Sequence, residues 1–266
     1  MAELLTGEAI AQTYNTPRRA DPYGAAEEYR QYQSRFESSQ LSDYKIAKKM
    51  EIPRGRVRGW KDGSKPDVVR AIEVADGHGW FDLGFDDDAF EAFNRLIAGV
   101  FSGGSISEET FLPSYSTPLD TVEQQVRNDL ETVGVGAVLV NSMSGNVEEI
   151  RPERDASVLG RVLVALGAPH GQKAKKTVEL PAYLDDAPLN IRTEFVRVYV
   201  ANRGSVVEEK GFVQLRETRP LWYHKQLADM ISSVIDADVT HGIDSVRVHI
   251  SVLDELGLQK PTDPTS

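Results

Sequence analysis

Apolar residues in the first third of the chain recur at the spacing of amphipathic helices. Tyr29, Tyr32 and Phe36 lie three and four positions apart, which predicts a helix over residues 25–37. Similar spacing predicts two short helices within residues 41–62 and another over residues 67–76. Prolines and polar residues interrupt the pattern near the N-terminus. We therefore expect a flexible arm over residues 1–24 and an all-helical domain over residues 25–82.

The remainder of the chain alternates helical and extended patterns, and it does so twice. Apolar residues at helical spacing predict long helices over residues 87–101 and 193–200. Each is followed by short segments typical of strands and by a further amphipathic helix. The fold class expected is α+β: an N-terminal helical domain, then a pseudo-repeated αββαββ domain over residues 87–258. The composition of residues 259–266 predicts a disordered tail.

The net charge of −11 is distributed unevenly along the chain. Residues 41–66 carry a net charge of +5 and residues 151–220 carry +3, whereas residues 67–150 carry −13. A polyanion such as a nucleic acid is attracted to the two basic regions and repelled by the acidic one. The basic regions are therefore the expected contact surfaces.

The segment from residue 41 to residue 62 has the pattern of a helix-turn-helix. Ile46 and Ala47 form the inner face of a first helix, and Pro53 suits the first residue of a second helix, where no N–H is needed. Val57 and Trp60 lie three apart and point inward. The segment resembles the helix-turn-helix of resolvases and of many regulators, which implies that the second helix enters the major groove of duplex DNA.

The outer side of the second predicted helix carries two glycines, flanked by arginines. Gly55 and Gly59 each cost roughly 1 kcal/mol relative to alanine, which a close approach of the backbone to base pairs would explain. Lysines nearby and in a later loop are expected to contact phosphates. The predicted DNA-binding residues are Lys45, Lys48, Lys49, Arg54, Gly55, Arg56, Arg58, Gly59, Lys61, Lys65, Lys173, Lys175 and Lys176. The alternative is a solvated basic hairpin in a protein-interaction domain.

Two segments at the ends of the long helices, Ile97–Ile106 and Phe195–Val206, resemble the motifs of the LAGLIDADG homing endonucleases. In active members of that family an acidic residue before Gly-Ser binds a divalent metal. The matching positions here are Gly103 and Arg203, neither of which binds a cation. The resemblance therefore implies a degenerate nuclease fold over residues 87–258, with no catalytic residue, metal or cofactor, similar to archaeal and haloarchaeal DNA-binding regulators.

Two alternatives remain open in the repeated domain. Glu108 and Glu109 follow the first motif at the offset at which Glu208 and Glu209 follow the second, and these pairs are candidate substitute metal ligands for an active endonuclease or nickase. A polar strand edge is the simpler interpretation. The acidic first repeat is also a candidate surface for a protein partner, an adaptor role or self-association.

Composition narrows the class of protein further. The chain has no cysteine, which excludes disulfides, thiol catalysis and cysteine-bound zinc. It has no apolar run near 20 residues and no N-terminal signal pattern. We therefore expect a cytoplasmic protein without a membrane partner, in which surface carboxylates suit a salt-rich cytoplasm. The expected function is that of a sequence-specific transcriptional regulator, not an enzyme, that binds double-stranded DNA.

Overall fold

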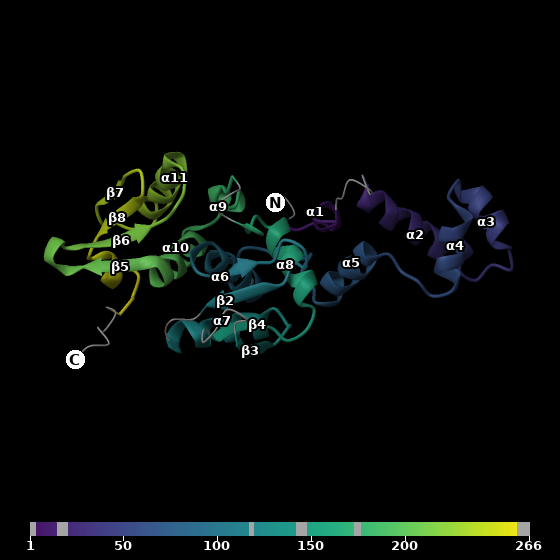
Figure 1. Cartoon of the computed structure of the whole chain (residues 1–266), viewed down its shortest axis with the longest axis horizontal. Coiled ribbons are helices and arrows are strands. Elements are labelled where there is room, and N and C mark those ends of the chain that lie inside the picture. Colours follow the sequence, from purple (N-terminus) through teal and green to yellow (C-terminus); the bar gives the residue numbers. More distant parts are fainter. Residues whose placement is uncertain (1–3, 15–20, 117–119, 142–147, 173–176, 260–266) are drawn as a thin grey trace. The chain divides into compact units, whose positions relative to one another are not determined.

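The computed structural model describes residues 4–14, 21–116, 120–141, 148–172 and 177–259 (Figure 1). The chain divides into two compact units, Met1–Asp82 and Leu83–Ser266. No described helix has the length and apolar character needed to cross a membrane.

The first unit is helical. Its helices are α1 (Gly7–Gln12), α2 (Pro22–Phe36), α3 (Asp43–Met50), α4 (Arg54–Lys61) and α5 (Asp67–Gly77). Helices α2 to α5 lie where the sequence predicts helices. Helix α1 lies inside the segment predicted as a flexible arm: the Thr6 hydroxyl accepts a hydrogen bond from the Ala9 amide at 3.0 Å, and Ile10 is fully buried. The prediction of a flexible arm overlooked the N-cap at Thr6 and the burial of Ile10 in this short helix.

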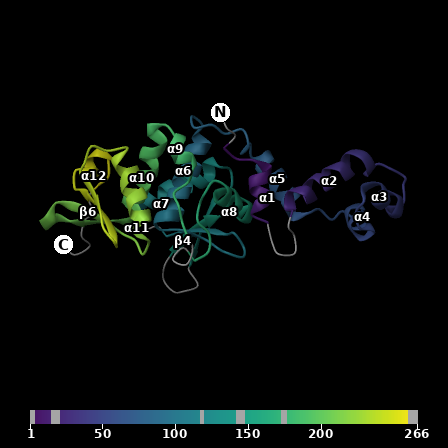
Figure 2. The ribbon, with the colours of Figure 1, turned by 90° about the horizontal axis from the view of Figure 1, so that it is seen from above.

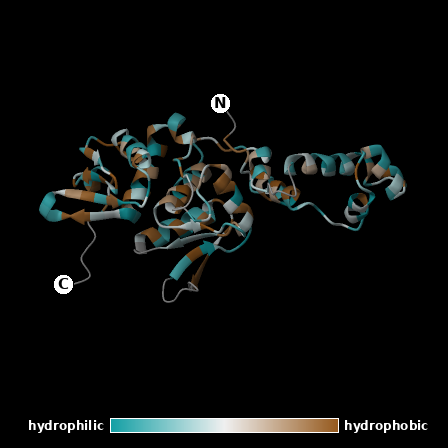
Figure 3. Cartoon of the chain, turned by 45° about the horizontal axis from the view of Figure 1, so that its top comes forward, coloured by the Kyte–Doolittle hydropathy of each residue, from teal (hydrophilic) through white to brown (hydrophobic). Residues whose placement is uncertain are grey.

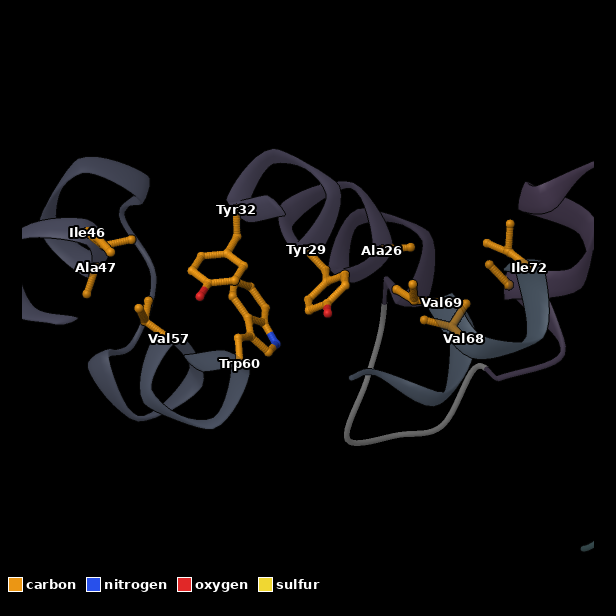
Figure 4. Packing of buried hydrophobic residues seen from close by; sticks show 11 residues of the cluster. Ala26, Tyr29, Tyr32, Ile46, Ala47, Val57, Trp60, Val68, Val69 and Ile72 are labelled. Carbon is orange, nitrogen blue, oxygen red and sulfur yellow. The ribbon is translucent and has the colours of Figure 1, made fainter. Parts of the chain in front are cut away.

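One hydrophobic cluster connects the helices of the first unit (Figure 4). The Trp60 indole packs against Tyr29 and Tyr32, with ring centroids 5.4 and 5.2 Å apart. Val57 and Ile46 are also fully buried. Aromatic pairs at these distances stabilise a fold by more than the burial of their surface area alone. Helix α4 is therefore fixed to α2 as well as to α3, which holds its outer residues in place.

The second unit contains the same order of elements twice. The first set is α6 (Asp88–Ser102), β1 (Ser105–Ile106), β2 (Pro113–Ser116), α7 (Asp120–Thr132), β3 (Ala137–Asn141), β4 (Glu148–Pro152) and α8 (Ala156–Ala165). After the short helix α9 (Tyr183–Asp186), the second set is α10 (Leu189–Arg203), β5 (Gly204–Val207), β6 (Phe212–Arg216), α11 (Leu221–Ser232), β7 (Val239–His241), β8 (Ser245–His249) and α12 (Val252–Glu255). The sequence analysis missed α9 and β7.

Each set forms one antiparallel four-stranded sheet, with strand orders β1-β2-β4-β3 and β5-β6-β8-β7 (Figures 1 and 2). Leu139 pairs with Ile150 in the first sheet, and Leu215 pairs with Val246 in the second. The edge strand β3 carries hydrophobic colour in Figure 3, and its Leu139 is partly exposed. The structure is thus α+β with two antiparallel sheets. This strand order does not test whether the repeat is of the LAGLIDADG type.

Helices α6 and α10 pack against each other at the centre of the second unit. Phe101 of α6 contacts Phe195 of α10 with ring centroids 5.8 Å apart. The Asn94 amide donates to the Ile191 carbonyl at 2.8 Å, deep in the same contact. Because this interface buries one whole side of each helix, it fixes the residues at their C-terminal ends.

Candidate nucleic-acid interface

Helices α3 and α4 are joined by a tight connection. The Ser42 hydroxyl accepts a hydrogen bond from the Lys45 amide at 3.4 Å and caps α3. Glu51 ends α3 in the left-handed region, with φ of 57°, and the Ile52 amide donates to the Ala47 carbonyl at 3.1 Å. Pro53 lies just before α4 as its N-cap, one position earlier than predicted. The helix pair is present, but its identity as a helix-turn-helix motif stays a prediction.

The predicted basic residues in the first unit fall into two groups. In the first group the side chains are exposed and form no ion pair with any residue that the structure describes; these are Lys45, Lys48, Lys49 and Arg54. We call them the α3–α4 cationic face. Lys48 and Lys49 each lie about one helical turn from Lys45 on α3, so the three lysines share one side of it.

The second group of basic residues is paired with carboxylates. Arg56 forms an ion pair with Glu28, and Lys61 lies 3.3 Å from Asp43. Two further contacts join Arg58 to Asp62 at 3.9 Å and Lys65 to Glu73 at 2.6 Å. The hydrogen bond that Lys65 donates to the Glu73 carboxylate raises the pKa of Lys65. These cations are partly neutralised, so less of their charge is available to an incoming phosphate.

The two glycines of α4 line a groove. This groove, of about 540 Å³, lies among the N-terminal half of α2, helix α4 and residues 64–67. A Cβ added at Gly55 would meet nothing within 4 Å, whereas one at Gly59 would lie 3.2 Å from the Ser64 hydroxyl. Asp21, Glu28 and Asp67 also line the groove. The two cations that line it, Arg56 and Lys65, are paired with Glu28 and Glu73, so its walls offer little free positive charge to a phosphate backbone.

Sequence reasoning missed an aromatic residue beside the cationic face. The Tyr44 side chain is 62% exposed on α3. It lies next to Lys45 in sequence and one helical turn from Lys48, so ring and ammonium groups share a surface. An exposed ring beside cations offers a stacking surface for an unpaired base. The signal was available in the sequence, because a tyrosine on the polar side of a basic helix has no packing role.

The remaining predicted basic residues, Lys173, Lys175 and Lys176, lie outside the described residues. The structure therefore neither brings them to the cationic face nor separates them from it.

The positions that would hold a nuclease metal carry other interactions. Gly103 is the C-cap of α6, and Arg203 ends α10 with its Nε 3.2 Å from a carboxylate oxygen of Glu217. Glu208 and Glu209 lie in a 3₁₀ turn (Glu208–Lys210), not on a strand edge. Glu108 and Glu109 are exposed in the turn between β1 and β2. Among the described residues, no group of three or more histidine, cysteine, aspartate or glutamate side chains is arranged to hold a metal.

Glu217 forms a buried polar cluster at the end of α10 that the sequence did not indicate. Its side chain is 4% exposed and accepts a hydrogen bond from the Tyr199 hydroxyl at 2.7 Å. Arg203 and Arg219 lie 3.2 and 3.9 Å from its carboxylate oxygens. Desolvation raises the pKa of Tyr199 well above its ordinary value, so its hydroxyl stays protonated and donates.

No model of a known protein family matches the chain. Curated proteins similar to part of it are named tRNA-splicing ligase RtcB. The Pyrococcus abyssi protein is 26% identical over 163 residues, which are 57% of this chain and 18% of the relative. The Pyrococcus furiosus protein is 24% identical over 171 residues, which are 58% of this chain and 17% of the relative. The Methanopyrus kandleri protein is 25% identical over 163 residues, which are 56% of this chain and 16% of the relative. The chain thus spans less than a fifth of these relatives.

These names correct several predictions made from the sequence. The resemblance to LAGLIDADG homing endonucleases and to archaeal DNA-binding regulators is contradicted, since the relatives are named as RNA ligases. The predicted transcriptional regulator, the endonuclease alternative and the adaptor role find no support in them. The assignment as a non-enzyme conflicts with relatives that are enzymes. Double-stranded DNA as the partner conflicts with a name that specifies tRNA. The motif residues misled because short Gly-Ser segments after apolar helices are not specific.

Proposed function

We propose that the chain binds folded RNA through the α3–α4 cationic face and Tyr44. The observation that carries the proposal is an exposed aromatic ring at the edge of a group of lysines that have no carboxylate partner among the described residues. Proteins recognise RNA largely through unpaired bases that stack on aromatic side chains, while cations contact the phosphates. The names of the similar proteins, which specify tRNA, support the choice of RNA. The proposal is limited to binding, because the match covers less than a fifth of each relative.

The groove beside α4 supports the same assignment. The cations in its walls are paired with carboxylates, which leaves α3, rather than the glycine side of α4, as the surface with free positive charge for a polyanion. Folded RNA presents loops whose bases are accessible to a single ring on a short helix, whereas bases of a duplex remain stacked inside. The cytoplasmic location expected from the sequence belongs to this proposal and is checked by fractionation of cells.

The stacking role of Tyr44 is tested by fluorescence anisotropy with a labelled tRNA transcript. Tyr44→Ala removes the ring and is expected to weaken binding by about 5- to 100-fold, corresponding to the loss of one stacked base. Tyr44→Phe keeps the ring and is the matched control, with affinity close to that of the unmodified chain. Equal affinity of all three proteins would show that no base stacks there. Tighter binding of a duplex DNA of similar length than of the transcript would overturn the choice of RNA.

The contribution of the lysines is tested by salt dependence. Lys48→Ala with Lys49→Ala is expected to reduce the slope of log affinity against log salt by about two, since each lysine neutralises one phosphate. The matched control is Lys210→Ala with Lys225→Ala, which removes the same charge from exposed positions in the second unit. Equal slopes for the two double variants would place the RNA elsewhere.

A further inference from the structure

The groove beside α4 has the size of a small-molecule site. Its volume of about 540 Å³ lies within the roughly 300–1,000 Å³ of ligand-binding pockets, and all of its lining residues belong to the first unit. Gly24 and Ala25 line it from α2, and Gly55 and Gly59 line it from α4. Because these positions carry at most a methyl group, the space between the two helices stays open. We call it the α2–α4 groove.

The wall of the α2–α4 groove contains a hydrogen-bond donor without an acceptor. Trp60 lines the groove and is only 6% exposed. Its indole N–H donates to no residue in the part of the chain that the structure describes, yet the nitrogen stays accessible. Figure 4 shows this nitrogen on the edge of the ring away from Val57. A largely buried indole N–H normally has a partner, so an accessible, unpaired one at a groove indicates a missing acceptor.

Two carboxylates of the α2–α4 groove have no cationic partner. Asp21 and Asp67 line it and form no ion pair with any described residue, whereas both cations in its walls are paired. Asp21 uses one oxygen to accept from the Gly24 amide at 2.7 Å, which leaves its other oxygen free. Asp21 caps α2 and Asp67 begins α5, so the helix dipoles offset part of each negative charge. The remaining charge favours a cation in the groove and disfavours an anion.

The connection between α4 and α5 adds a hydroxyl to the α2–α4 groove. Ser64 is exposed and lines the groove, and its amide donates to the Gly59 carbonyl at 2.8 Å. This bond holds the Ser64 hydroxyl against α4, where a Cβ added at Gly59 would lie 3.2 Å from it. A hydroxyl both donates and accepts, so it suits either polar group of a ligand.

We propose that the α2–α4 groove binds a small organic cation that also carries a hydrogen-bond acceptor, as an amine with an amide group does. The ammonium group contacts the free carboxylates of Asp21 and Asp67, and the acceptor takes the hydrogen bond of the Trp60 indole. A flexible chain between the two groups lets one molecule reach both without a fixed spacing. This site goes beyond RNA binding, because the glycine side of α4 lies outside the proposed RNA contact.

The proposal is tested by NMR titration of the full chain, labelled with ¹⁵N at tryptophan, with lysinamide. Lysinamide carries ammonium groups and an amide oxygen on a flexible chain. The indole resonance of Trp60, assigned by its absence from the Trp60→Phe protein, is expected to shift saturably as its N–H gains an acceptor. The indole resonance of Trp222, which belongs to the second unit, is expected to stay in place.

Two variants locate the binding. Gly55→Leu places a side chain in the groove at a position where an added Cβ meets nothing within 4 Å, and it is expected to abolish the shift. Leucine favours a helix more than glycine does, so α4 is retained. Gly77→Leu is the matched control, since Gly77 is equally open but does not line the groove. Asp67→Asn is expected to weaken binding by about 2- to 5-fold, and Asp76→Asn, the control on the same helix, is expected to leave it unchanged.

Lysinamide acetylated at both amines keeps the acceptors, loses the charges and is the contrasting probe, expected to bind more weakly. Absence of a saturable shift with lysinamide, equal affinity for the acetylated form, or full affinity of the Gly55→Leu protein would each overturn the proposal. Equal effects of Asp67→Asn and Asp76→Asn would do the same. Because no RNA is present, failure of this titration would overturn the groove site alone, and full RNA affinity of the Tyr44→Ala protein would overturn the proposed function alone.

Discussion

The two basic regions of the chain look alike in sequence and differ in structure. In residues 41–66, four cations are exposed and unpaired with described residues. In residues 151–220, several arginines face carboxylates: Arg151 lies 2.9 Å from Glu149, Arg197 lies 2.8 Å from Glu194, and Arg203 shares Glu217 with Arg219. Net charge therefore does not measure what a polyanion meets. The first region has charge available for binding, whereas the second uses much of its charge to hold the fold together.

The largest effect is expected from the buried carboxylate of the second region. Glu217→Ala removes a buried carboxylate that faces Arg203 and Arg219 and accepts from the Tyr199 hydroxyl, and this is expected to cost about 3–5 kcal/mol of the free energy of unfolding. Denaturant unfolding measures the change. The matched variant Asp62→Ala removes the partner of the exposed Arg58 and is expected to cost less than about 1 kcal/mol. Similar costs for both variants would remove the structural distinction between the regions.

The next effect concerns Glu149, the partner of Arg151. The Ser114 hydroxyl donates to this carboxylate and is the main cause that lowers the pKa of Glu149 below its ordinary 4.5, with Arg151 as a further cause. Ser114→Ala is expected to raise that pKa and to cost about 1–2 kcal/mol at neutral pH. Because a lowered carboxyl pKa stabilises the fold above pH 4.5 and not below, this cost is expected to shrink as pH falls below 4.5.

The measurement for Glu149 is its carboxyl titration by NMR, together with unfolding at pH 7 and pH 3. Ser205→Ala, at an exposed position on β5 of the second sheet, is the control and leaves the pKa of Glu149 in place. A cost of Ser114→Ala that does not vary with pH would mean that packing, rather than charge, holds this pair.

A smaller effect separates two arginines of the first region. Arg54 is exposed without an ion pair among the described residues, while Arg56, two positions later, pairs with Glu28. Arg54→Ala is expected to reduce the salt slope of tRNA binding by about one, and Arg56→Ala is expected to change it much less. Anisotropy titrations at several salt concentrations measure both. Equal salt slopes for the Arg54→Ala and Arg56→Ala proteins would mean that the ion pair with Glu28 leaves the charge of Arg56 available to RNA.

The smallest effect is expected at the glycine side of α4. Gly55→Ala adds a methyl group in open space within a helix and is expected to stabilise the first unit by about 0.5–1 kcal/mol. Its affinity for tRNA is expected to stay unchanged, because the glycine side of α4 does not contact the RNA in our proposal. Gly59→Ala gains less, since its Cβ lies 3.2 Å from the Ser64 hydroxyl. Weaker RNA binding by the Gly55→Ala protein would place the nucleic acid against the groove.

Two short motifs in the second unit led to a wrong prediction of function. The segments Ile97–Ile106 and Phe195–Val206 follow long apolar helices, and that placement led to a resemblance which the names of the relatives contradict. Tyr44, in contrast, was readable from its position on a polar helical face. The Glu217 cluster carried no such signal, because it forms only where the fold brings the end of α10 against the segment after β6.

Local patterns along the chain were enough to predict helices α2 to α5, most of the helices and strands of the second unit, and the uneven distribution of charge. These features depend on periodicity, caps and composition, which act over a few residues. The fold alone sets which cations are paired, as Arg56 is with a carboxylate 28 positions earlier, and which polar side chains meet, as Asn202 and Ser102 do across 100 positions. The physical reason is that ion pairing and burial depend on distance in space, which a local pattern does not encode.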